Sequence, residues 1–565
     1  MDHLIAICTR KYTLSITLTA ASILLDSENF PSLSRFAMNF SPIFSVCYDT
    51  YVLAKRRNGP MEPSPRKKIP LVSSAHSQLA RLSVSAILLA CLAAFAPAQD
   101  PKTSDLKAFV DSRTKNRDAI AASLQSQYQT LENSMSWKAK AGYERLTQKV
   151  YLPADFDDEV LKGLDALDHR WPFLDLPLEE NTRQATWLAH GLSARPDDPK
   201  RPLQYVVTPA GQYVMNCFAC HGGNLYGASY PGAPNTTYAL ESLTEKIRKT
   251  KFKLGKPLAQ MDLGSMVMPL GTSNGTSNAV MFGVALMNFR DADLNIHTNR
   301  IPAPMVHHDM DAPPWWHFYR KSHLYIDGFA EKGHKGLMQF MLVRQNGPDK
   351  FRLWEKDFRE VYRFLEELRP PKFPLAIDAT KSQKGAVVFQ DHCARCHGTY
   401  QSSESTTRNV GKYPELMVDI EDINTDRVRF DSLTAKHRDA YGQSWFADYG
   451  KQSTYTQVAG YVAPPLDGIW ASAPYLHNGS VPTLWHLLHP QERPKVWRRI
   501  AMGLDEESIG LVVETLDEVP SKLSNADRRW YFDTQVTGKS AQGHDYPDEL
   551  TEEQKSDLLE YLKTL

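Results

Sequence analysis

Two short stretches of the sequence combine two cysteines and a histidine at the same spacing. They read C-x-x-C-H, at Cys217, Cys220 and His221 and again at Cys393, Cys396 and His397. Two thiols at this spacing can form thioether bonds with the two vinyl groups of a haem, and the histidine behind them can bind the iron. The two stretches therefore predict two covalently bound c-type haems.

Two other chemistries use paired cysteines. A structural zinc site needs four ligands, hence two such pairs or nearby downstream histidines, and a thioredoxin-like dithiol has no use for the histidine. Exported proteins usually pair spare cysteines in disulfides. The other three cysteines, Cys8, Cys47 and Cys91, precede an expected signal cleavage site at Ala98, so the mature chain has none to spare. Zinc and a disulfide remain the alternatives to haem.

The N-terminal region resembles an export signal. Residues 81–100, "RLSVSAILLACLAAFAPAQD", have a basic lead-in, a short apolar run and a small-residue cleavage site at Ala98. We expect a signal peptide over 61–98 and a periplasmic or secreted protein. Residues 1–60 are expected to lie upstream of the true start codon and not to belong to the protein. The apolar run is short for a membrane span, so no integral span is expected. An uncleaved anchor and a lipid-modified Cys91 are the alternatives.

Length and charge limit the classes of partner. A chain of 565 residues with 42% hydrophobic residues is long enough for two or more globular domains. Lys plus Arg and Asp plus Glu both number 65, so nothing favours nucleic acid as a partner.

Helical patterns near both motifs predict how the haems are positioned. The fold class expected is mainly α, with two tandem cytochrome c-like haem domains, a helical N-terminal extension and long loops. The boundaries predicted are a helical lead-in over 99–200, a first haem domain over 201–370 and a second over 371–565. Val361, Phe364, Leu365 and Leu368 recur at helical spacing before Pro370 and Pro371. At the C-terminus, Thr551 and Gln554 fit a capping box that opens an apolar helix.

The sixth iron ligand of a cytochrome c domain typically lies in a loop before the closing helix. His544 occupies that place in the second unit, and its alternative role is that of a surface loop histidine. No histidine occurs between His221 and His297, so the first haem is expected to be either five-coordinate or bound by a more distant side chain. The candidates are His307, His308, His317, His323, His334, Met338 and Met341.

The residues resemble the di-haem cytochrome c peroxidase and MauG-like superfamily from about residue 170 to 565. The stretch "APPLDGIWASAPYLHNGSVPTLWHLL" is similar to its second-domain signature. "DAPPWWHFYRKSHLYIDGF" and "LGTSNGTSNAVMFGVAL" are closer to its rubber oxygenase branch.

This resemblance implies roles for individual residues. His221, His397 and His544 would bind iron, and His477 would lie beside the second haem. Trp315 or Trp316 would lie near the path between the haems. An apolar pocket for dioxygen would be lined by Phe329 and by the segment from Ala279 to Val284. The alternative role of each aromatic residue is core packing.

Three functions compete: an oxygenase for an apolar or polyisoprenoid substrate, a peroxidase fed by a small redox protein, and an electron carrier. Cleavage of the O–O bond of hydrogen peroxide is helped by a nearby acid or base, and residues 264–289 contain none. The displaceable histidine of the superfamily's peroxidases is also lacking, which favours dioxygen and an apolar substrate. Asp309 and Asp311 are carboxylates that could reach the iron from elsewhere. A calcium ion is a further candidate cofactor.

Overall fold

The computed structural model describes residues 101–165, 173–175, 183–300, 306–400 and 411–565. The predicted upstream sequence and signal peptide lie outside these ranges. The described residues of 101–297 and 306–565 form one compact unit, which contains both C-x-x-C-H motifs. No helix within the described ranges has both the length and the apolar character needed to cross a membrane.

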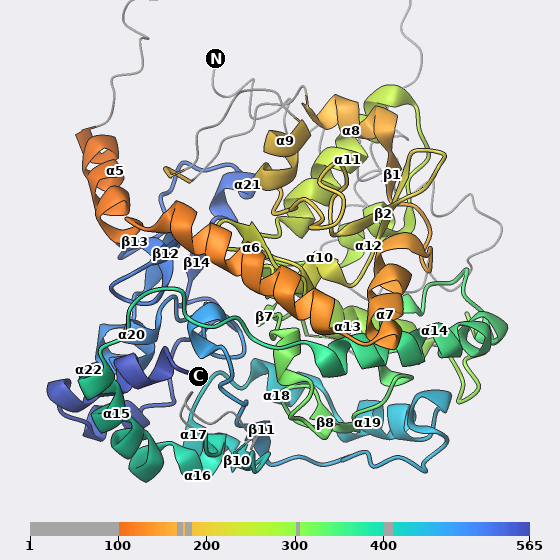
Figure 1. Ribbon diagram of the computed structural model, residues 1–565. Helices are drawn as coiled ribbons and strands as arrows, with labels where there is room; N and C mark the ends of the chain where they lie inside the picture. The colour runs from red at the N-terminus through yellow and green to blue at the C-terminus, as the bar shows by residue number, and fades with distance from the viewer. Residues whose placement is uncertain (1–100, 166–172, 176–182, 301–305, 401–410) are drawn as a thin grey trace, which may run out of the picture. The chain divides into compact units, whose positions relative to one another are not determined.

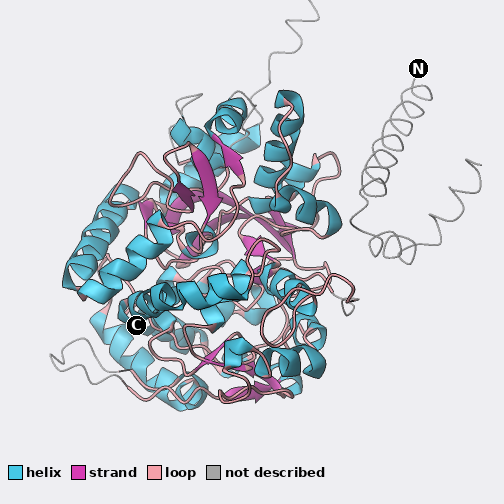
Figure 2. Ribbon diagram, turned by 90° about the vertical axis from the view of Figure 1, so that its right-hand side faces the viewer, coloured by secondary structure: helices cyan, strands magenta, loops and turns pink. Residues whose placement is uncertain are grey.

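Helices dominate this unit, with small antiparallel sheets between them (Figure 2). The prediction of a mainly α fold is therefore confirmed in its coarse form. The N-terminal part contains α5 (Pro101–Arg113), α6 (Arg117–Ser134), α7 (Trp137–Gln148), α8 (Asp158–Asp165) and α9 (Arg183–Ala189). The middle part contains α10 (Phe218–His221), α11 (Leu240–Leu254), α12 (Gln260–Val267), α13 (Ala279–Asn288) and α14 (Pro348–Glu367), with 3-10 turns η1 (Trp315–His317) and η2 (Gly336–Met341).

The C-terminal part holds shorter helices between two long ones. The α-helices are α15 (Ala379–His392), α16 (Ala394–His397), α17 (Ile420–Ile423), α18 (Val428–Ser432), α19 (Ala435–Gly442), α20 (Leu484–Leu488), α21 (Asn525–Arg528) and α22 (Glu552–Leu562). The 3-10 turns are η3 (Trp445–Ala447), η4 (Ile469–Ala471), η5 (Pro490–Glu492) and η6 (Tyr546–Glu549).

The strands form six small sheets among the described residues. Three strands, β1 (Phe156–Asp157), β3 (Gln212–Met215) and β2 (Tyr205–Val207), lie in that order before α10. Two-stranded ladders join β4 (Asn224–Leu225) to β5 (Ala228–Ser229), β6 (Thr276–Ser277) to β7 (Met310–Asp311), β8 (His323–Leu324) to β9 (Ala330–Glu331), and β10 (Met417–Asp419) to β11 (Gly460–Val462). The sheet with the longest strands has the order β13 (Gly510–Leu516), β12 (Val496–Asp505), β14 (Tyr531–Asp533).

Two helix pairs repeat one packing arrangement, α7 against α14 and α15 against α22 (Figure 1). Each pair crosses at a glycine. A Cβ on Gly142 of α7 would overlap the carbonyl oxygen of Glu360 in α14, and a Cβ on Gly385 of α15 would overlap the carbonyl oxygen of Asp557 in α22. Only glycine lets two helix backbones approach this closely.

The two closing helices form as their sequences predict. α14 begins with Pro348 at its first turn and ends at Glu367, shortly before Pro370, because the residue before a proline avoids the helical conformation. α22 has Thr551 as its N-cap, and the capping box with Gln554 is present. Buried apolar side chains along both helices supply most of the stabilisation.

Candidate haem sites

The first motif forms a short helix, α10, directly after strand β3. Its thiols are free cysteines, and burial raises the pKa of Cys217 to about 12 and that of Cys220 to about 11. Reactive dithiols have lowered thiol pKa values, because their chemistry needs the thiolate. These environments therefore do not favour dithiol exchange.

His221 is oriented by the backbone and by one indole. Its Nδ1 lies 3.0 Å from the carbonyl oxygen of Pro313, and its ring stacks on Trp315 with centroids 4.8 Å apart. Since a carbonyl oxygen only accepts hydrogen bonds, Nδ1 carries the proton and Nε2 keeps its lone pair. Burial lowers the pKa of His221 to about 4, so the imidazole is neutral at neutral pH. A neutral imidazole with a free Nε2 is the form that binds a metal.

The second motif repeats this arrangement. The Nδ1 of His397 lies 2.8 Å from the carbonyl oxygen of Pro464, and burial lowers the pKa of its imidazole. Pro313 and Pro464 are each the first proline of an Ala-Pro-Pro sequence. This repeated tripeptide is a signal for the orienting carbonyls that sequence reasoning missed.

His544 lies across from His397, with ring centroids 6.2 Å apart and the planes inclined by 65°. Two imidazoles that share one metal ion, each bound at about 2 Å through nitrogen, have ring centres roughly 6 Å apart. The backbone of His544 is held in the left-handed region, with φ of 54°, and its N–H donates to the carbonyl of Ile423 at 2.8 Å. Burial lowers the pKa of His544 to about 3, so it too is neutral.

No imidazole among the described residues lies across from His221 in this way. The five histidines proposed as sixth ligands each contact another group through one ring nitrogen: His307 contacts Asp309, His308 the carbonyl of Val306, His317 that of Asp467, His323 Glu415, and His334 Glu355. Nε2 of His308 and of His323 is buried without a partner among the described residues, so these two stay candidates. Met338 and Met341 are buried in the main apolar core.

Helix α13 lies beside the first motif. Ser277, two residues before Ala279, is hydrogen-bonded to Cys220, which ties the start of α13 to the motif. Gly283 is buried, yet a Cβ built on it would meet nothing within 4 Å. A buried glycine facing open space in an apolar helix is a cradle that a flat hydrophobic group such as haem fits.

The two adjacent tryptophans connect the two motifs. Trp315 stacks on His221, whereas Trp316 is fully buried and its Nε1 donates to the carbonyl of Asp467 at 2.9 Å. His317 also bonds that carbonyl oxygen, at 2.9 Å. Asp467 lies three residues after Pro464, so a single segment contacts the orienting loops of both motifs.

Other predicted residues have well-defined surroundings. Phe329 is buried and stacks on Tyr325 with centroids 4.5 Å apart, so it is a core residue. The ring of His477 lies 4.6 Å from that of Tyr461, and its carbonyl accepts from the N–H of Asp311 at 3.0 Å.

The two candidate carboxylates differ sharply. Asp309 accepts hydrogen bonds from Thr272 and Thr276 and pairs with Lys539 at 3.0 Å, and its pKa is strongly lowered, since these donors outweigh burial. It is an ionised anchor for a loop. Burial instead raises the pKa of Asp311 well above its usual range, and the Asp311 carboxyl contributes to the raised thiol pKa of Cys220. Burial thus favours the protonated form of Asp311, beside the first motif.

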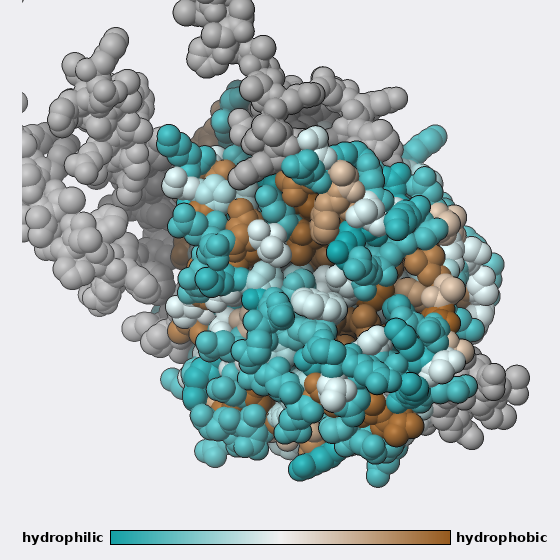
Figure 3. Space-filling model, turned by 90° about the vertical axis from the view of Figure 1, so that its left-hand side faces the viewer, coloured by the Kyte–Doolittle hydropathy of each residue, from teal (hydrophilic) through white to brown (hydrophobic). Residues whose placement is uncertain are grey.

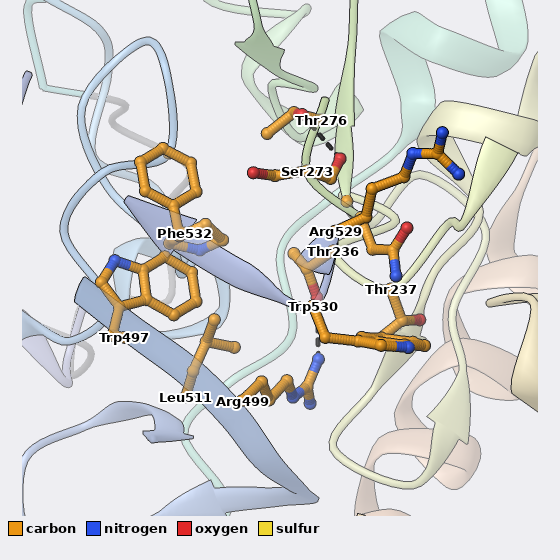
Figure 4. Close-up of a pocket in the computed structure, with 14 residues that line it drawn as sticks. Thr236, Thr237, Ser273, Thr276, Trp497, Arg499, Leu511, Arg529, Trp530 and Phe532 are labelled. Carbon is orange, nitrogen blue, oxygen red and sulfur yellow. Dashed lines mark hydrogen bonds between the residues drawn. The ribbon is translucent and has the colours of Figure 1, made fainter. Parts of the chain in front are cut away.

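A further small pocket lies between strand β12 and the 273–276 turn (Figure 4). Trp497 and Phe532 stack in it with centroids 5.1 Å apart. Arg499 donates to Thr236 Oγ1 at 2.8 Å and to the carbonyls of Ala501 and Met502, so it joins β12 to the middle part. No group of three or more His, Cys, Asp or Glu side chains in the described part of the chain is arranged to hold a metal ion.

One segment of the chain matches a known protein family. Residues 460–498 match the family model described as RoxA-like, cytochrome c-like. The matched segment contains Pro464 and His477 but neither C-x-x-C-H motif. A cytochrome c-like domain implies covalently bound haem, and the residues around both motifs fit that group. The relationship to rubber oxygenase-like cytochromes is thus supported in coarse form.

Two proteins of Sinorhizobium fredii (strain NBRC 101917 / NGR234) are similar to longer stretches. "Uncharacterized protein y4iM" is 29% identical over 286 residues, which are 45% of this chain and 64% of that protein. "Uncharacterized protein y4iJ" is 28% identical over 257 residues, 35% of this chain and 41% of that protein. The chain thus spans less than two thirds of the length of either relative.

Proposed function

We propose that this protein is an exported haem-dependent oxidoreductase with two covalently bound c-type haems in tandem cytochrome c-like domains. The first haem, on Cys217, Cys220 and His221, does oxygen or peroxide chemistry. The second, on Cys393, Cys396 and His397, stores or relays electrons. Its partners are an apolar substrate or a small redox protein, with dioxygen or hydrogen peroxide as oxidant.

The observation that carries this proposal is the repeated anchoring of the two motif histidines. Both donate Nδ1–H to the first carbonyl of a Pro-Pro pair, and both leave Nε2 free. The two glycine crossings, at Gly142 and Gly385, support the same duplication. Chance resemblance of one motif would not reproduce an orienting carbonyl and a matching helix pair.

The assignment of roles follows from what lies opposite each histidine. His544 faces His397 at a ring separation that would let both imidazoles bind one iron, which would suit electron transfer because little room would remain for a substrate there. Among the described residues the ring contact of His221 is with Trp315, not with a second imidazole, and α13 supplies apolar side chains. An accessible iron beside an apolar wall suits dioxygen and a hydrophobic substrate.

The protein's own residues would act by orientation and exclusion. Haem, when bound, supplies the redox chemistry. His221 is kept neutral and aimed by Pro313, α13 keeps water from the first site, and Trp316 holds the loop of the second motif at Asp467. The Trp315–Trp316 pair offers a short route for electrons between the two sites.

Oxygen uptake tests the leading reaction. We would add polyisoprene latex to the purified, haem-loaded protein without peroxide and follow dioxygen with an electrode. Sustained uptake with carbonyl products supports the oxygenase. The control is the same protein with Cys217 and Cys220 both changed to alanine, which should consume none. Absence of uptake by the unaltered protein contradicts this substrate.

Asp311 favours a peroxidase as the second candidate. A carboxyl whose burial favours the protonated form, beside the first motif, is the type of group that assists O–O cleavage. Turnover of hydrogen peroxide with a reduced small cytochrome should then fall by about 10²-fold or more in Asp311→Asn. Unchanged turnover in that variant removes the reason to prefer this reaction.

A further inference from the structure

Two arginines and one aspartate form a buried cluster that is not balanced in charge. Arg429 of α18 and Arg438 of α19 both contact Asp327, at 3.4 and 2.9 Å. The three residues are 1%, 5% and 0% exposed. Two guanidinium groups therefore share one carboxylate, and the cluster carries a net positive charge away from water.

Several hydrogen-bonding atoms of this cluster have no partner in the described part of the chain. They are Nε and Nη1 of Arg429 and Nε of Arg438. A buried arginine normally satisfies its N–H groups, because each unsatisfied group costs roughly 1 to 3 kcal/mol and more when charged. Unpaired donors on an excess positive charge indicate that an anion completes the site.

Neighbouring groups add further donors. The hydroxyl of Tyr325 is also buried without a partner among the described residues, and it lies within electrostatic range of Arg429. Lys321 donates to the carbonyl of Tyr325 at 3.2 Å and brings a further positive charge to this side. The cluster thus offers several donors of different kinds to one anion.

The position of the cluster relates it to the haem sites. Arg429 is within electrostatic range of Tyr461 and His477, and Tyr461 lies three residues before Pro464. Next to α18, Asp426 accepts from the backbone N–H of Ser540, in the segment that leads to His544. The guanidinium of Arg429, with its unpaired donors, therefore lies near segments that surround the second motif.

We propose that Arg429, supported by Arg438, binds a carboxylate, and that this carboxylate is a propionate of a covalently attached haem. The inference rests on the proposed function, since it needs a haem to be present. A carboxylate fits because guanidinium presents its N–H donors in a fork that matches two oxygens. One propionate would balance the second arginine and occupy the unpaired donors.

The first test is the reduction potential of each haem in the holoprotein. Arg429→Gln removes a positive charge beside one haem, so the oxidised state is stabilised and one of the two midpoint potentials becomes more negative. Asp327→Asn removes a negative charge and should shift the same potential in the opposite direction. Arg427→Gln is the matched control, because Arg427 lies on the same segment but is exposed and paired with Glu421 and Asp431.

Opposite shifts in Arg429→Gln and Asp327→Asn, with none in Arg427→Gln, support the proposal. Unchanged potentials in Arg429→Gln overturn it. If that variant does not fold, Arg429→Lys keeps the charge and loses the fork, and the propionate bending modes in the resonance Raman spectrum should move. Unmoved modes in a folded Arg429→Lys protein also overturn it.

A soluble anion is the other source of the same chemistry. If the site takes a free carboxylate, adding acetate should raise the thermal midpoint of the unaltered holoprotein in a saturable way, and Arg429→Gln should abolish the effect. That result overturns the assignment to haem. Haem content measured beforehand keeps the tests separate: a chain without covalent haem contradicts the proposed function, whereas a haem-loaded chain with unmoved potentials contradicts only this inference.

Discussion

The two C-x-x-C-H sites are alike on the side of the motif histidine and different on the opposite side. His221 and His397 both donate to a proline carbonyl, and both are kept neutral by burial. Across from His397 stands His544, while α13 lies beside the first motif with apolar side chains and the open space at Gly283. The two sites thus share the orientation of the motif histidine and differ in what other segments bring to the opposite face.

The surface of the described chain is mostly polar on one face. Figure 3 shows polar and charged side chains over most of one face of the described chain, with smaller apolar groups among them. The buried polar atoms without a partner lie in the interior of the described chain instead.

Removing one pair of thiols should have the largest effect. Changing Cys393 and Cys396 to alanine should reduce covalent haem to about half, because thioethers to the other motif are independent. Pyridine haemochrome absorbance and intact mass measure this, with Cys217 and Cys220 changed as the reciprocal variant. Retention of full haem content by either variant would break the proposed equivalence of the motifs.

The second-largest effect is expected from removing His544, which would distinguish the two haems by their iron ligands. His544→Ala should convert the second haem from low to high spin and leave the first unchanged, because only the second loses an axial ligand. Electronic and electron paramagnetic resonance spectra report this. The control is His489→Ala, since His489 instead stacks on Trp485 at 4.1 Å. An unaltered low-spin signal in His544→Ala would contradict the assignment.

The helix crossings test whether the duplication extends to packing. Gly385→Ala places a methyl group against the carbonyl of Asp557 and should lower the free energy of unfolding by about 3 kcal/mol. Gly142→Ala should cost a similar amount. Val387→Ala, at a side chain 61% exposed on the same helix as Gly385, should change it by less than about 0.5 kcal/mol. Urea unfolding measures all three. Tolerance of alanine at one glycine alone would make the two crossings unequal.

A pH effect at His317 is the smallest expected. Burial lowers the pKa of His317 to about 4, below about 6.5 for an unfolded histidine. Between these values the unfolded state binds the proton and the folded state does not, so stability falls as pH decreases from about 7 to 4. The contribution is at most roughly 3 kcal/mol. Urea midpoints of His317→Gln should fall less over this range than those of the unaltered protein, and parallel curves would contradict this.

Local sequence patterns predicted much of the framework. The closing helices α14 and α22, the capping box at Thr551 and the helix before the second motif all depend on neighbouring residues, and the structure contains them. The sheet of β12, β13 and β14 was not predicted, because its pairing joins strands separated by turns and by α21, and burial on both faces removes the alternating pattern.

The sequence alone predicted the chemistry of attachment, because two thiols and a histidine on one helical turn are a local property of the chain. It also indicated His544 by its position before a closing helix. Only the tertiary structure decided which carbonyl orients each histidine, that His544 faces His397, and that Arg429 keeps unpaired donors. These features join residues far apart in the chain, and their geometry exists only once the helices have packed.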